Sequence, residues 1–136
     1  MTVAKVSTGG RFEEIGAYSR AKRVGPFVFV AGTTAIEPSG RLHAPYDAYR
    51  QSKYIFERTE NTLRQLGAQM RHVVRTRAFL SDISKAGDFV RAHGEVFKGI
   101  DPVTSGVEAG LTMPGMMIEI EFDALIHDEN GEVDYR

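Results

Sequence analysis

Apolar and polar residues alternate along several short segments of the chain, a pattern typical of β-strands. The alternation is cleanest over residues 116–126, where every even-numbered side chain is apolar and three odd-numbered ones are acidic. Residues 72–80 follow the same period of two, and Val74 and Thr76 are expected on one face of that strand. Two further strands are predicted over residues 27–31, which stop at Gly32, and residues 104–109.

Apolar residues spaced three or four positions apart predict two helices. The first helix spans residues 46–67, and Gly67 is expected to end it. Asp82 or Ser84 can cap a second helix that runs to Phe97. The apolar side of this second helix is expected to carry Ala86, Phe89, Val90 and Phe97.

The order of these elements predicts one α+β domain over residues 1–136. After an N-terminal hairpin come a strand, a helix, a strand, a helix and two strands, so both helices should pack on one face of a mixed sheet. The polar tail from His127 is expected to fray. The uncovered face would carry Phe79 and Leu125 among charged side chains, a mixture that favours packing between subunits through their sheets.

The composition excludes several classes of protein. The chain has 136 residues and a formal net charge of −1, which gives no electrostatic basis for binding nucleic acid. Because it has no cysteine, it cannot hold a disulfide scaffold or a thiolate nucleophile. No signal-peptide pattern and no apolar run of roughly 18 residues occurs, so we expect a cytoplasmic protein without a membrane partner.

The predicted last strand places three carboxylates on one face. Glu119, Glu121 and Asp123 are roughly 6 to 7 Å apart along the strand and should repel one another unless cations lie nearby. Arg75 and Arg77 have the same spacing, so Glu121 and Asp123 are expected to form ion pairs with them across neighbouring strands. Glu119 is nearest the start of its strand, and it can either pair likewise or hold a water molecule or a substrate proton.

Other candidate chemistry is sparse. The four histidines have no partners at metal-ligand spacing, so no metal site is expected. His93 is the one histidine with a possible catalytic role, although a solvated or hydrogen-bonded helix histidine fits the pattern better. Ser105 has no evident base beside it, and the position of Tyr18 alone assigns its hydroxyl no task.

Six short segments together form a recognisable series: residues 15–21, 24–25, 28–32, 66–68, 79–83 and 118–121. In their order and spacing they resemble the RidA (YjgF, L-PSP endoribonuclease-like) family over about residues 12–126. The resemblance implies a chorismate-mutase-like fold of the bacillary type and a homotrimer whose sheets form a central barrel. It also implies small-molecule pockets between subunits and hydrolysis of enamines and imines such as 2-aminoacrylate, without a metal or an organic cofactor.

The resemblance also assigns roles to individual residues. Glu119 matches the family's glutamate that is thought to position the attacking water, and Tyr18 matches the tyrosine of its Gly-Pro-Tyr-Ser motif. Thr104 stands where active members carry the arginine that clamps the substrate carboxylate. A threonine hydroxyl supplies neither the positive charge nor the bidentate fork of a guanidinium.

The other pocket positions implied by the resemblance are more apolar than in active members. Ala31 replaces a serine, and Val90 falls at the asparagine position of the second helix, although a shift of one residue would place Arg91 there. His93 stands where the family usually has tyrosine. The substrate-binding positions implied in this way are Thr104, Gly32, Ala31, Val90, His93 and Ser105.

Three functions remain open at this point. The first is an enamine or imine hydrolase in which Glu119 orients water, with a substrate that lacks a carboxylate or binds Arg20, Arg23 or Arg91 instead. The second is a non-catalytic binder or sensor that uses the same intersubunit pocket for a small molecule. A ribonuclease or translation inhibitor is the least favoured, because no general acid and base accompany a cationic phosphate site.

Overall fold

A computed structural model describes residues 2–136, which form a six-stranded sheet with helices on one side. The strands are β1 (Val3–Val6), β2 (Ala21–Val24), β3 (Phe27–Thr34), β4 (Val73–Leu80), β5 (Val103–Glu108) and β6 (Ile118–Leu125). The α-helices are α1 (Arg11–Gly16), α2 (Ala48–Gln65) and α3 (Ala86–Phe97), and the short 3-10 helices are η1 (Met70–His72) and η2 (Ile83–Lys85).

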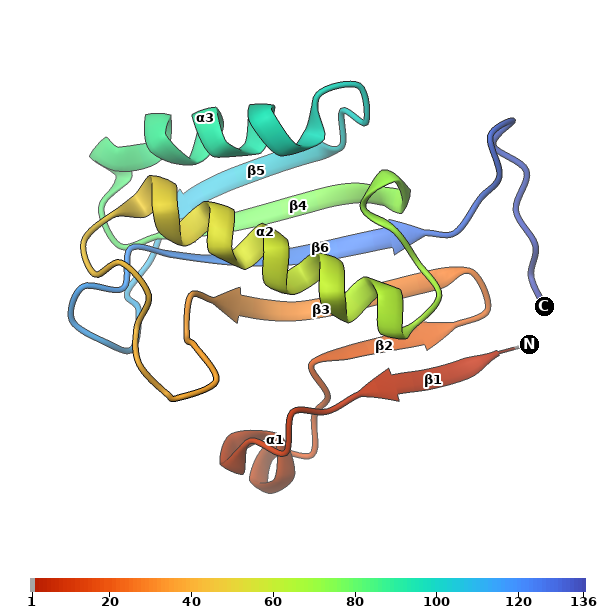
Figure 1. The fold of residues 1–136 in the computed structure, drawn as a ribbon, viewed down its shortest axis with the longest axis horizontal. Helices are drawn as coiled ribbons and strands as arrows, with labels where there is room; N and C mark the ends of the chain where they lie inside the picture. Colours follow the sequence, from red (N-terminus) through yellow and green to blue (C-terminus); the bar gives the residue numbers. More distant parts are fainter. Residues whose placement is uncertain (1) are drawn as a thin grey trace.

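The sheet is mixed, as the order of elements predicts. Its strand order is β1-β2-β3-β6-β4-β5, and neighbouring strands are antiparallel except for the parallel pair β4 and β5. Helix α3 makes the crossover between these two parallel strands. Figure 1 shows α2 and α3 lying across the same face of the sheet, which confirms the predicted α+β arrangement.

The core lies between this helical layer and the sheet. Ile118, Ile120 and Phe122 of β6 are fully buried there, and Glu119 and Glu121 alternate with them on the other face. We call the face that no helix covers the open face. Phe27 and Phe29 of β3 lie on it and are 40% and 51% exposed. In the single chain, the open face therefore exposes large aromatic side chains to solvent.

Two register shifts correct the predicted strands. A shift between Val30 and Thr33 accommodates Gly32, so β3 continues to Thr34 instead of stopping at Gly32. A second shift between Val73 and Arg75 makes the expectation for Val74 wrong: Val73 is buried and Val74 is 42% exposed. Such shifts depend on the partner strand, so a strict period of two cannot predict them.

Val90 does not belong to the apolar face of α3. It is 63% exposed, and Ala92 and the half-buried His93 take up the inward positions beside the buried Phe89 and Phe97. The prediction failed because an aromatic-rich helix can satisfy a spacing of three or four on two neighbouring faces.

The N-terminal region contains α1, a helix that the pattern did not predict. α1 lies between β1 and β2, which pair with each other as an antiparallel hairpin-like unit. Phe12 and Ile15 of α1 are 72% and 70% exposed, so burial of an apolar stripe does not stabilise this helix within one chain.

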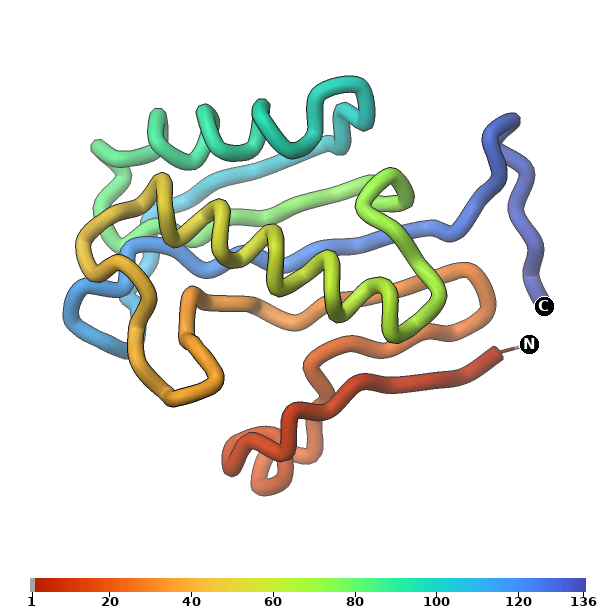
Figure 2. The backbone as a smooth tube through the Cα atoms, viewed as in Figure 1, coloured from red at the N-terminus to blue at the C-terminus, as the bar shows by residue number. Residues whose placement is uncertain are grey.

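The expectation of a frayed C-terminal tail is wrong for the structure. His127 and Val133 form an antiparallel bridge, and the Thr2 amide donates a hydrogen bond of 2.8 Å to the Arg136 carbonyl. Figure 2 shows the tail turning back beside the start of β1. These backbone hydrogen bonds hold a segment that has little apolar surface of its own.

Candidate functional site

The carboxylate of Glu119 lies over the backbone of Gly32. A Cβ atom built on Gly32 would come within 2.5 Å of Glu119 Oε1, so any side chain at position 32 would displace this carboxylate. Thr34 in β3 and Phe79 in β4 flank Glu119 across the sheet. Gly32 thus gives Glu119 a defined place on the open face.

The other two carboxylates of the strand are neutralised. Arg77 Nη1 lies 3.2 Å from Glu121 Oε1 and 3.2 Å from Asp123 Oδ2, and Arg75 Nε lies 3.8 Å from Asp123 Oδ2. The predicted cross-strand ion pairs are therefore confirmed. Within residues 2–136 Glu119 has no cationic partner within 4.0 Å, so its carboxylate is free to accept hydrogen bonds from a water molecule.

Tyr18 lines a hollow of about 430 Å³ on the open face, together with Ala31, Phe29 and the ion pairs of Arg77. The Tyr18 side chain is 47% exposed. Ala31 is the neighbour of Gly32 along β3, but neither Gly32 nor Glu119 is among the residues that line this hollow. The structure thus places Tyr18 and Ala31 in one hollow and the Glu119 carboxylate over the next residue of β3.

The remaining predicted site residues lie on and around β5. Thr104 is exposed on this edge strand, and its hydroxyl lies within hydrogen-bond distance of the Thr76 hydroxyl, at 2.7 Å. On its other side the Thr76 hydroxyl lies 2.9 Å from His93 Nε2. Ser105 is also exposed but is in register with Arg77 on the opposite face, and Val90 points away from the sheet on α3.

A single chain cannot bring Glu119 and Thr104 to one small molecule. Thr104 is in register with Thr76, and Thr76 with Phe122, which is three residues after Glu119. Two strand spacings and three residues along the strand separate them, roughly 14 Å between Cα atoms. They also lie on opposite faces, because Thr104 contacts the buried Thr76. One copy of the chain therefore holds the two predicted groups of site residues apart.

The three arginines considered as replacements for the missing clamp have different surroundings. Arg20 Nη2 donates a hydrogen bond of 2.7 Å to the Gly32 carbonyl, which places it beside the Glu119 region. Arg23 donates to the Gly25 and Leu66 carbonyls, and the Arg91 guanidinium lies 3.7 Å from the centre of the Tyr49 ring. Of the three, Arg20 is the one that contacts a predicted site residue.

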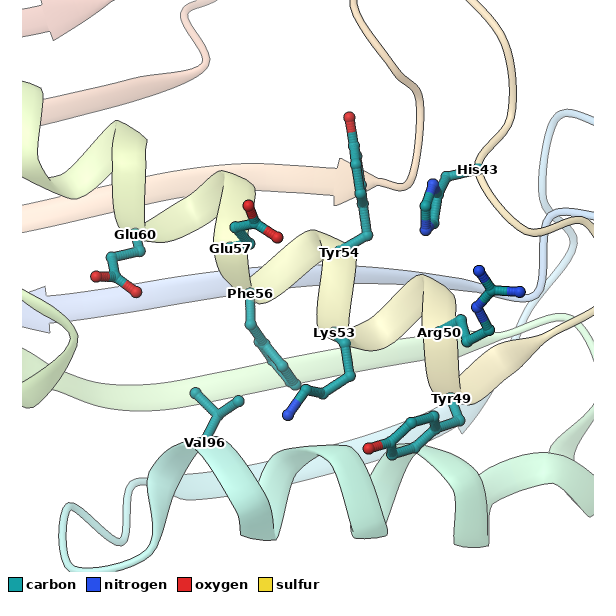
Figure 3. Close-up of a pocket in the computed structure, with 9 residues that line it drawn as sticks. All are labelled: His43, Tyr49, Arg50, Lys53, Tyr54, Phe56, Glu57, Glu60 and Val96. Carbon is teal, nitrogen blue, oxygen red and sulfur yellow. The ribbon is translucent and has the colours of Figure 1, made fainter.

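A separate groove of about 590 Å³ runs between α2 and α3 (Figure 3). It contains no residue predicted for the site. Two of the charged groups at its rim have partners, since Lys53 Nζ lies 3.6 Å from Glu95 Oε1 and Glu60 pairs with Arg64. The Tyr49 hydroxyl also donates to Glu95. The lining residues are His43, Tyr49, Arg50, Lys53, Tyr54, Phe56, Glu57, Glu60 and Val96.

Two further features are absent from residues 2–136. No group of three or more histidine or acidic side chains there is arranged to hold a metal ion. No helix in the same part of the chain is long and apolar enough to span a membrane.

Comparison with known proteins identifies the family. Residues 8–126 match the family model described as endoribonuclease L-PSP. The chain belongs to this family. The predicted resemblance to RidA and YjgF proteins is thereby confirmed.

Individual L-PSP family members are similar to the chain over most of its length. A YjgF/YER057c/UK114 family structure from Mycobacterium tuberculosis is 40% identical, with a TM-score of 0.81, and covers 92% of this chain and 100% of its own. A RutC family protein from Pyrococcus abyssi is 31% identical over 79% of this chain and 84% of its own length. The rat protein named 2-iminobutanoate/2-iminopropanoate deaminase is 28% identical over 85% of each chain.

Sequence reasoning about this L-PSP family member did not single out Thr76 as a site residue. Thr76 is fully buried and joins His93 to Thr104. A polar residue among Ala78 and Leu80 on a predicted core face was a signal, because a buried hydroxyl needs a hydrogen-bond partner. The partners themselves could not be predicted, since they come from strand pairing and helix packing.

Proposed function

We propose that this L-PSP family protein hydrolyses small neutral imines or enamines to a carbonyl compound and ammonia. Water adds to the carbon of the C=N bond, the nitrogen gains a proton, and the resulting carbinolamine loses ammonia as the carbonyl forms. The observation that carries the proposal is the Glu119 carboxylate, which lies over Gly32 without the arginine partners that hold Glu121 and Asp123. A free carboxylate at a fixed place can accept a hydrogen bond from the attacking water.

The proposed reaction takes place between subunits of a homotrimer. Glu119 and Thr104 lie roughly 14 Å apart on opposite faces of one sheet, so a second copy is needed to bring them to one ligand. Exposed Phe27 and Phe29 on the open face supply apolar surface for packing sheets against one another. Tyr18 and Thr104 would donate hydrogen bonds to the substrate in the completed pocket.

A neutral substrate follows from Thr104. A hydroxyl cannot form the bidentate, charge-assisted pair by which a guanidinium binds a carboxylate. The rat relative's name specifies imines of 2-oxo acids, which carry such a carboxylate. This chain should therefore act on a different substrate from that relative, with the Glu119 carboxylate positioning the water.

The test compares two imines generated in situ. An amine oxidase acting on a primary amine supplies a neutral imine, and an amino acid oxidase acting on 2-aminobutanoate supplies 2-iminobutanoate. Semicarbazide reacts faster with the imine than with the carbonyl product, so enzymatic hydrolysis lowers the initial rate of semicarbazone formation. We expect the protein to accelerate hydrolysis of the neutral imine and to leave the anionic one largely untouched. Thr104→Arg should raise the rate with 2-iminobutanoate by about tenfold or more.

The matched pair Glu119→Gln and Glu121→Gln tests the carboxylate. Glu119→Gln should lower kcat/KM for the neutral imine by about 10²-fold or more, because general acid–base groups typically contribute 10²–10⁴-fold. Glu121→Gln, whose carboxylate is paired with Arg77, should retain most of the activity. Equal losses in the two variants would contradict the role of Glu119.

A non-catalytic binder is the second candidate. It is favoured because position 104 holds a threonine in place of the arginine of active members. If the protein only binds its ligand, neither the wild type nor Thr104→Arg should accelerate the hydrolysis of either imine. Binding of neutral small molecules, measured as a rise in melting temperature, would then remain. That combination of results would replace the hydrolase proposal.

A further inference from the structure

Three side chains from different elements form a hydrogen-bonded series across the core. His93 Nε2 from α3 lies 2.9 Å from Thr76 Oγ1 in β4, and Thr76 Oγ1 lies 2.7 Å from Thr104 Oγ1 in β5. Thr76 is fully buried, His93 is half-buried, and Thr104 is exposed at the edge of the sheet. We call this series the His93–Thr76–Thr104 chain. It leads from the His93 imidazole, on the inner side of α3, to the Thr104 hydroxyl on the molecular surface.

The surroundings of His93 are aromatic and uncharged. Its ring centre lies 6.0 Å from that of Phe56, 5.3 Å from that of Phe89 and 4.7 Å from that of Phe97. Burial alone lowers the pKa of the His93 imidazole below its ordinary value, and no charged group in residues 2–136 opposes this shift. At neutral pH the ring is therefore uncharged and carries one N–H group.

Two proton arrangements fit the His93–Thr76–Thr104 chain. A hydroxyl has one proton to donate, and Thr76 Oγ1 lies within hydrogen-bond distance of both His93 Nε2 and Thr104 Oγ1. With the imidazole proton on Nε2, His93 donates to Thr76, Thr76 donates to Thr104, and the Thr104 proton is left to point outward. With that proton on Nδ1, the direction reverses and Thr104 presents an acceptor. The first arrangement makes the exposed Thr104 hydroxyl a hydrogen-bond donor.

We propose that His93 is a positioning residue that, through Thr76, holds the Thr104 hydroxyl as an outward donor and so selects a neutral ligand with a hydrogen-bond acceptor. This inference rests on the proposed function, because it concerns the same pocket. A carbonyl oxygen or an imine nitrogen fits such a donor. A carboxylate fits it poorly, since one neutral hydroxyl does not balance the charge that a ligand loses from its water shell.

A structural role alone explains less of the arrangement. The pocket around His93 is lined by Phe56, Phe89 and Phe97, and an apolar side chain would pack there without a partner to satisfy. A buried Thr76 hydroxyl could also be satisfied by a backbone carbonyl in its own strand pair. The three groups instead connect in series to the strand position that the family resemblance places at the substrate. The series therefore serves the exposed hydroxyl.

The test uses His93→Gln and His93→Phe as a matched pair. The glutamine amide nitrogen can occupy the place of Nε2 and donate, whereas phenylalanine fills the aromatic pocket without donating. Butanamide serves as the neutral probe and butanoate as the anionic one, each titrated against the full-length protein and followed by NMR at Thr104. We expect butanamide to bind and butanoate not to bind. Butanamide binding should weaken about tenfold in His93→Phe and stay within about threefold in His93→Gln.

Two further measurements separate this role from packing. Imidazole nitrogen NMR should show Nε2 protonated in the wild type, and Thr76→Val should shift that signal while it weakens butanamide binding like His93→Phe. Equal binding in His93→Phe and wild type, an unprotonated Nε2, or no binding of butanamide to the wild type would each overturn the inference. If butanamide binds as expected but no imine is hydrolysed, the hydrolase proposal fails and the role of His93 stands.

Discussion

At Gly32 the absence of a side chain makes room for a carboxylate. The Glu119 oxygen occupies the volume that a Cβ atom would need, at 2.5 Å from its ideal position. We predict that Gly32→Ala folds, because the carboxylate is the flexible end of a long side chain and can move aside. The displaced carboxylate should lower kcat for the neutral imine by about 10- to 100-fold, since misplacement by about 1 Å is costly in catalysis.

Gly87→Ala is the control for this substitution. Gly87 lies in α3, and a Cβ atom there would meet nothing within 4 Å. Alanine at this helical position should keep the activity and add about 0.5–1 kcal/mol of stability. Unchanged kinetics in Gly32→Ala would show that the position of the Glu119 carboxylate does not matter for the reaction.

At the scale of elements, one buried amide joins α2 to two loops. Gln51 Nε2 donates to the Ala44 carbonyl at 3.0 Å and to the Gly115 carbonyl at 2.8 Å, and Gln51 Oε1 accepts from the Met117 amide at 2.8 Å. Gln51→Leu should lower the free energy of unfolding by about 2–4 kcal/mol, because buried backbone groups lose their partners. Thermal unfolding at fixed protein concentration measures the loss.

Gln65→Leu offers a matched comparison on the same helix. Gln65 is exposed near the end of α2, so its replacement should change the free energy of unfolding by no more than about 0.5 kcal/mol. Similar melting temperatures for the two variants would contradict the claim that Gln51 holds the loops.

At the scale of the whole molecule, the open face is the surface through which we expect subunits to pack. Arg77 neutralises Glu121 and Asp123 in the middle of this face. Arg77→Glu would gather three acidic side chains there, and the repulsion should shift the protein from the proposed trimer to monomers. Sedimentation or light scattering at several concentrations and salt levels would measure this change.

Arg64→Glu is the control for the oligomer. Arg64 pairs with Glu60 on the exposed side of α2, so the substitution creates a comparable local repulsion on the helical layer. The proposed trimer should survive it. Dissociation in both variants, or in neither, would argue against the open face as the interface.

Much of the fold could be predicted because burial imposes a period on each element. The alternation in β6 predicted that Ile118, Ile120 and Phe122 face the core, and all three are fully buried. The same reasoning predicted the ion pairs of Glu121 and Asp123 with the arginines of β4. It failed at Val74 and Val90, where a register shift and a second possible helix face changed which side chain points inward.

The sequence by itself determined the two long helices, the approximate positions of the main strands and the family, because these depend on residues that are close along the chain or on matching motifs. The tertiary structure alone decided that Gly32 lies under Glu119 and that Thr76 joins His93 to Thr104. These contacts link residues that are far apart along the chain. Their geometry depends on the register of three paired strands and on the packing of α3, which no local period encodes.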